Sequence, residues 1–145
     1  MFKFRLTPLI AFRDNTLKEC QRELAKAYDA RRILEEYVQE IDRQLEEGIA
    51  TVRELSQPGK TINVESLIGF RRQEMFLRAN QDDLLHKIKQ IDEEIEIRRV
   101  AVIEADRALK IVEKLKEKRY EKYLEEENKI ETKTMDETAG NRWWR

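Results

Sequence analysis

Residues 55–64 read LSQPGKTINV and separate two long stretches of helical patterning. Proline fixes φ and lacks a backbone N–H, and glycine tolerates positive φ, so Pro58 and Gly59 predict a tight turn. Asn63 is a favoured N-cap residue. The chain is therefore expected to leave one helix before Pro58 and to enter a second one near Asn63.

On the N-terminal side of this turn, apolar residues recur at alternating intervals of three and four. Arg13, Arg31 and Gly48 interrupt the series. Its remaining members are Ile10, Leu17, Cys20, Leu24, Ala27, Leu34, Val38, Ile41, Leu45, Val52 and Leu55. Such a repeat forms a narrow apolar seam along one side of a helix, and the seam needs a second helix to cover it.

The same alternation resumes after the turn, with interruptions at Glu74, Gln81 and Arg98. The apolar members of this second seam are Leu67, Phe70, Leu77, Leu84, Ile88, Ile91, Ile95, Val102, Ala105, Leu109 and Val112. Helices joined by a short connection lie antiparallel, so the two seams should cover each other. Counting outward from the turn leaves residues after about 118 without a partner from the first helix.

The predicted fold is all-α, a two-helix antiparallel coiled-coil hairpin with a C-terminal helical overhang. Residues 1–145 form a single helical hairpin in this prediction. The predicted parts are helix one at about 8–56, a turn at 57–62, helix two at about 63–137, and a flexible tail at 138–145.

Composition narrows the function. Lys and Arg total 29 against 30 for Asp and Glu, a mixed balance that argues against nucleic acid, because phosphate binders usually carry a clustered positive surplus. The single cysteine, Cys20, favours a reducing compartment, and no apolar run approaches the length of a membrane span. A soluble, cytoplasmic protein is expected.

The chain is poorly supplied with catalytic residues. One histidine and one cysteine leave His/Cys zinc sites and Cys–His pairs out of reach. His86 falls on an outer face, where an ordinary surface histidine is the simpler interpretation. A narrow hairpin also leaves little room for a cleft, so the sequence predicts a protein that is not an enzyme, with no cofactor and no small-molecule substrate.

Apolar residues that the hairpin does not need for its seam mark possible binding surfaces. Near the turn, Ile68, Met75 and Phe76 lie off the seam and indicate either a docking surface or incidental packing on helix one. At the open end of the hairpin, two groups of apolar residues should lie close together. They either bind a partner or simply close the end of the coiled coil. They are Phe2, Phe4, Leu6, Leu9 and Phe12 on one side and Ile111, Leu115, Tyr120 and Tyr123 on the other. The final residues, Arg142-Trp143-Trp144-Arg145, are expected to be disordered.

Two stretches resemble the FliJ family of the bacterial flagellar type III export apparatus. Residues 2–14, FKFRLTPLIAFRD, are similar to the start of that family, and residues 112–139, VEKLKEKRYEKYLEEENKIETKTMDETA, are similar to its C-terminal stretch. The terminal Trp pair departs from the family pattern. The resemblance implies a cytoplasmic stalk that enters the hexameric export ATPase, much as the γ stalk enters the ring of rotary ATP synthases.

The resemblance also implies contact with the cytoplasmic domain of the membrane export gate and with export chaperones. The protein would then lie near the inner membrane at the flagellar base, held only through its partners. The residues implied to face the ATPase are Arg13, Lys118, Arg119, Asp136 and Glu137, and those implied to face the gate are Phe70 and Phe76. Two alternatives stay open: the stalk of a virulence-type secretion system, and a self-associating structural coiled coil.

Overall fold

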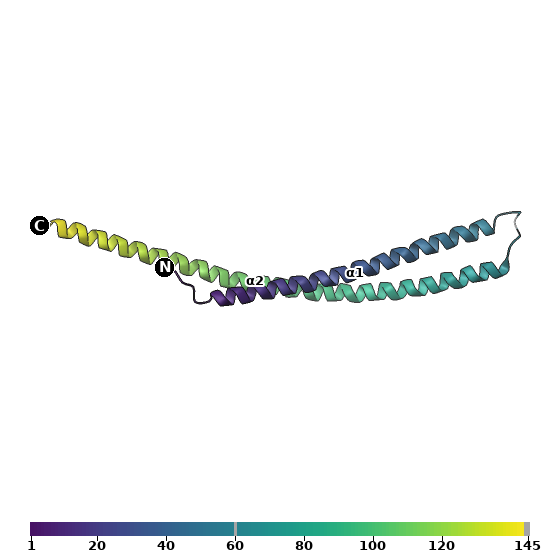
Figure 1. Ribbon diagram of the computed structural model, residues 1–145, viewed down its shortest axis with the longest axis horizontal. Coiled ribbons are helices and arrows are strands. Elements are labelled where there is room, and N and C mark those ends of the chain that lie inside the picture. Colours follow the sequence, from purple (N-terminus) through teal and green to yellow (C-terminus); the bar gives the residue numbers. More distant parts are fainter. Residues whose placement is uncertain (60, 144–145) are drawn as a thin grey trace. The chain divides into compact units, whose positions relative to one another are not determined.

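The computed structural model describes residues 1–59 and 61–143 (Figure 1). It contains two helices, α1 at Thr7–Leu55 with 49 residues and α2 at Val64–Trp143 with 80 residues. No strand occurs in the described residues. The predicted all-α helical hairpin is therefore confirmed.

The N-terminus of α1 is fixed by the residues that precede it. The backbone N–H and the hydroxyl of Thr7 both donate to the carbonyl of Phe4, at 3.2 and 2.8 Å. Pro8 occupies the first turn, where a missing N–H leaves no hydrogen bond unmade. The segment before α1 is thereby held close to the helix start.

The turn between the helices follows its residues. Gly59 has a φ of 90°, which lies in the left-handed region that favours glycine. The side-chain oxygen of Asn63 accepts hydrogen bonds from the backbone N–H groups of Glu65 and Ser66, at 3.1 and 3.4 Å. Asn63 is therefore the N-cap of α2, as its position predicted.

The helix bounds differ from the sequence prediction mainly at the C-terminus. Helix α2 continues to Trp143 instead of ending near residue 137. Residues 138–143 contain no proline, and Gly140 costs a helix only about 1 kcal/mol, which is too little to end it by itself. Trp144 and Arg145 lie outside the described residues, so the flexibility of the tail stays a prediction.

The chain divides into two compact units, which are described separately. The turn unit comprises Arg22–Val100, and the terminal unit comprises Met1–Gln21 together with Ala101–Arg145. In the turn unit, Ile41 and Leu45 of α1 form the core with Leu77 of α2, and Leu84 packs against them. The predicted seam is filled here within one chain.

Polar residues interrupt this seam and contact the opposite helix. Arg31 Nε lies 3.0 Å from Asp92 Oδ1 and 3.3 Å from Glu35 Oε1. The Nε–H group makes no hydrogen bond with either oxygen, so both contacts are ion pairs. Gln81 donates its amide N–H to Asp42. The two interhelical contacts are eleven residues apart on both helices, which fixes the register of the pair.

The terminal unit has its own small core. Phe4, Leu109 and Val112 are buried, and the seam residues Ile10 and Leu17 of α1 are half-buried. Farther along α2, every described residue from 124 to 143 is exposed. This last part of α2 is the helical overhang that the sequence predicted.

Candidate protein-binding surfaces

In the terminal unit, aromatic side chains on the segment before α1 pack onto α2. The ring centroid of Phe2 lies 5.2 Å from that of Tyr120 in an edge-on arrangement and 5.4 Å from that of Tyr123. Phe4 is only 8% exposed, and the guanidinium carbon of Arg119 lies 5.8 Å from its ring centroid. We call these five residues the aromatic clasp.

A hydrogen bond within α2 orients one side of the aromatic clasp. The Tyr123 hydroxyl donates to Glu127 Oε1 at 2.6 Å, and this hydrogen bond raises the pKa of Tyr123 above its ordinary value. The hydrogen bond restrains the Tyr123 side chain, whose ring lies against Phe2. The sequence placed Tyr123 in the open-end group that either binds a partner or closes the coil, and left the choice open.

The other predicted residues of the terminal unit lie near the aromatic clasp but differ in exposure. Leu6 is half-buried just before α1, and its carbonyl accepts hydrogen bonds from the first turn of that helix. Leu115 and Lys118 are exposed on α2. Arg13 is half-buried in the seam, and its Nε is buried without a hydrogen-bond acceptor.

Asp136 and Glu137 lie apart from the aromatic clasp. Both are exposed on the overhang of α2, more than a dozen residues beyond Tyr123. At about 1.5 Å per residue along a helix, that separation is roughly 20 Å. The structure therefore joins Phe2, Phe4, Arg119 and Tyr120 into one surface but does not add the two acidic residues to it.

In the turn unit, the three residues predicted to bind a partner do not share one surface. Met75 and Phe76 are exposed, at 72% and 66%. Phe70 is half-buried because it is a seam residue and points between the helices. Of these three residues, Met75 and Phe76 present apolar area to a partner, and exposed Ile68 adds to it.

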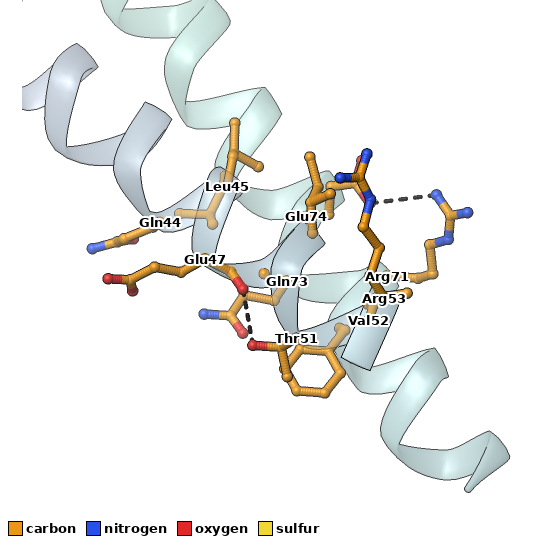
Figure 2. Close-up of a pocket in the computed structure, with 13 residues that line it drawn as sticks. Gln44, Leu45, Glu47, Thr51, Val52, Arg53, Arg71, Gln73 and Glu74 are labelled. Atoms are coloured by element: carbon orange, nitrogen blue, oxygen red, sulfur yellow. Dashed lines mark hydrogen bonds and ion pairs between the residues drawn. The ribbon is translucent and has the colours of Figure 1, made fainter. Parts of the chain in front are cut away.

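A cavity of about 340 Å³ lies between α1 and α2 beside Phe70 (Figure 2). It forms where the seam has Gly48, whose added Cβ would meet no atom within 4 Å. Figure 2 shows Glu74 of α2 at this cavity, with Arg71 Nη1 3.4 Å from its carboxylate. The interruption of the seam at Gly48 was the sequence signal for it, but a narrow hairpin was not expected to leave such a space.

Two further observations bear on the chemistry available. The described residues contain no group of three or more His, Cys, Asp or Glu side chains arranged to hold a metal ion. Neither helix, over its described length, has an apolar stretch long enough for a bilayer crossing. The surfaces that stand out are aromatic, apolar and basic, which are features of protein interfaces.

The chain matches a known protein family along nearly its whole length. No curated protein and no solved structure shows a significant match. The model of the FliJ family, described as the flagellar FliJ protein, matches residues 2–145. The match includes both stretches that carried the resemblance. The chain therefore belongs to the FliJ family, a non-enzymatic family of the flagellar protein export apparatus.

Proposed function

We propose that this chain is a stalk that binds the hexameric export ATPase, links it to the export gate and handles export chaperones. The match to the flagellar FliJ family over residues 2–145 carries the proposal. It also favours a flagellar over a virulence-type stalk. Binding through its partners would hold the protein at the inner membrane near the flagellar base.

The terminal unit is the part that we assign to the ATPase. Its aromatic clasp combines exposed Tyr120 with Arg119, and Lys118 is exposed beside them. Aromatic and arginine side chains dominate the binding energy of many protein interfaces. Because Phe2 already holds the Tyr120 ring in place, little side-chain entropy is lost when a partner binds it.

Mixing the purified chain with the export ATPase tests this assignment. We expect the chain to promote hexamer formation and to increase ATP hydrolysis, and Tyr120→Ala to reduce both effects severalfold. Tyr37→Ala is the matched control, since Tyr37 is an exposed tyrosine of the turn unit, at 57% against 46% for Tyr120. If a saturating concentration of the chain changed neither assembly nor hydrolysis, the ATPase proposal would be wrong.

We assign the export gate to exposed Met75 and Phe76 of the turn unit. Phe76→Ala should weaken capture of the cytoplasmic domain of the gate protein and leave the helical circular dichroism signal unchanged. Ile97→Ala serves as the control, because Ile97 is exposed to a similar degree, at 64%. A large loss of helix in Phe76→Ala would instead make Phe76 part of the packing, and equal capture by both variants would move the gate site elsewhere.

Chaperone handling is the part of the proposal that depends most on cellular context. Removing the gene should reduce motility and therefore chemotactic swimming, and the native chain should restore both. Co-purification of an export chaperone with the native chain, measured with and without the ATPase, would test direct binding. Restored motility without any chaperone binding would remove chaperone handling from the proposed function.

A further inference from the structure

The two long flanks of the helix pair in the terminal unit have different chemistry. The interhelical contacts of the turn unit show which residues lie on the same flank. Asp42 and Asp92 each directly follow a seam isoleucine in the sequence. Each of these aspartates contacts a seam residue of the other helix. Residues that follow such seam positions therefore lie on the same side of both helices. Residues that precede seam positions lie on the opposite side, and the same repeat continues into the terminal unit.

On the first flank of the terminal unit, acidic residues follow the seam and are ion-paired. Asp14 lies 2.9 Å from Lys18 Nζ, and Asp106 lies 2.8 Å from Lys110 Nζ. The Asp106 carboxylate raises the pKa of Lys110 above its ordinary value. These charges are matched within their own helices and exposed to water, so they need no partner, although Ile103, which is 43% exposed, also lies on this flank.

The second flank is apolar only near the aromatic clasp, because Glu19 and Glu104 lie on the same flank nearer the turn. Leu9 and Phe12 of α1 and Ile111 of α2 each directly precede a seam position, and Leu115 lies about one helical turn beyond Ile111. Phe12 is 61% exposed and Ile111 is 68% exposed. Since Phe4 contacts Arg119, and Phe12 and Ile111 each lie eight residues nearer the turn, the two side chains lie at about the same level. We call these four residues the apolar flank.

Arg13 gives the apolar flank a charge preference. Its guanidinium carbon lies 6.0 Å from the ring centroid of Phe12, a residue of the apolar flank, and its Nε is buried without an acceptor. By contrast, Arg98, a seam arginine of the turn unit, donates to the Glu23 carbonyl at 2.7 Å and to Glu94 at 2.9 Å. A partner carboxylate would form charge-assisted hydrogen bonds with the other N–H groups of the Arg13 guanidinium.

We propose that the apolar flank, together with Arg13, binds an amphipathic helix of a partner protein whose apolar stripe is bordered by Asp or Glu. A third helix laid against two paired helices buries its apolar stripe against both, in the helix-in-groove manner. The basic N-terminal side of the surface suits it, because residues 1–13 contain Lys3, Arg5 and Arg13 and no acidic residue. This inference goes beyond the proposed function, since it concerns the chemistry of a surface and holds whichever partner supplies the helix.

A synthetic helix tests the inference on the full chain. The probe is a peptide of about three heptads with Leu at its seam positions and Glu at the flanking positions, whose like charges keep it from pairing with itself. The matched probe has Lys in place of every Glu. We expect the acidic peptide to bind, to lose affinity as salt is raised, and to slow amide hydrogen exchange in residues 7–21 and 101–118. The basic peptide should not bind.

Variants of the chain locate the site. Ile111→Gln should weaken binding of the acidic peptide by about tenfold, because it removes an exposed apolar anchor. Ile130→Gln should change binding less than about twofold, since Ile130 is equally exposed, at 65%, but lies on the overhang. Arg13→Gln should flatten the salt dependence. Both isoleucines are exposed, so neither variant should disturb folding.

Three results would overturn the inference. The acidic peptide could fail to bind, it could bind Ile111→Gln as well as the native chain, or sedimentation could show a dimer that Ile111→Gln dissociates. The last result would make a second copy of the chain the occupant of the apolar flank. Peptide binding and stimulation of the export ATPase are separate readouts, so either can fail while the other holds.

Discussion

At the residue scale, the glycines and charged residues of the helices have distinct physical roles. Gly59 is required by its positive φ, whereas Gly48 sits in a helix with open space where a side chain would be. The charged residues mostly pair within one helix, at exposed positions where screening by water leaves each pair a small contribution to stability. Single substitutions can separate these roles.

Replacing Gly48 by alanine should stabilise the chain. Alanine lowers the entropy of the unfolded chain and favours helix, and its Cβ would meet no atom, so we expect about 1 kcal/mol more stability in urea unfolding. Gly69→Ala, in another open helical position, should stabilise by a similar amount. Gly59→Ala should destabilise, because its φ of 90° strains any side chain. Equal effects at all three glycines would contradict this interpretation.

Acid should remove part of the stability of α1. Hydrogen bonds from Arg43, and then from Gln44, lower the pKa of Glu40 below its ordinary value of 4.5. A carboxyl group with a lowered pKa stabilises the folded chain fully above 4.5, and this stabilisation is lost as the pH falls through the folded pKa. Thermal unfolding of Glu40→Gln should therefore depend less on pH below 4.5 than that of the native chain. Identical pH profiles would mean that the interactions of Glu40 add nothing in solution.

At the element scale, the seam was predictable and its polar contacts were not. Every apolar seam residue inferred from the sequence is buried or half-buried, because a seven-residue repeat leaves a helix only one face to bury. The sequence marked Arg31 and Arg98 as interruptions but could not name their partners on the other helix, which depend on the register between two helices. The aromatic clasp was predictable as a group of neighbours, whereas the separate position of Asp136 and Glu137 depended on where the partner helix stops.

The N-cap of α2 is an element whose contribution can be measured alone. Asn63→Ala removes the oxygen that accepts the N–H groups of Glu65 and Ser66, so we expect a loss of about 1 kcal/mol in urea unfolding. Thr61→Ala is the control, since Thr61 is exposed and precedes the cap. A loss as large in Thr61→Ala would show that the turn, and not the cap, is responsible.

At the scale of the whole molecule, stability and binding are assigned to different residues. The seam and Phe4 hold the helices together, while Tyr120 of the aromatic clasp, Phe12 and Ile111 of the apolar flank and the Met75–Phe76 surface are exposed. Mutations in the second group should therefore separate function from folding. The overhang of α2 is a further exposed segment, because every described residue from 124 to 143 is exposed.

Deleting residues 124–145 should leave the remaining chain as stable as the native one, because every described residue of that segment is exposed. The midpoint of urea unfolding measures this. Leu109→Ala, which truncates a buried seam residue, should cost about 3 kcal/mol and provides the contrast. A comparable loss on truncation would mean that the overhang packs on the rest of the chain in solution.

The matched spacing of the Arg31–Asp92 and Asp42–Gln81 contacts constrains how such a chain can change in length during evolution. An insertion between these contacts in one helix alone would shift the later seam residues out of register with the other helix. One of the two interhelical contacts would then be lost. A tolerated insertion or deletion of about seven residues, one heptad, in one helix should therefore be accompanied by an equal change at the same level of the other helix. Homologues of different length would then differ by steps of about fourteen residues, two heptads at a time.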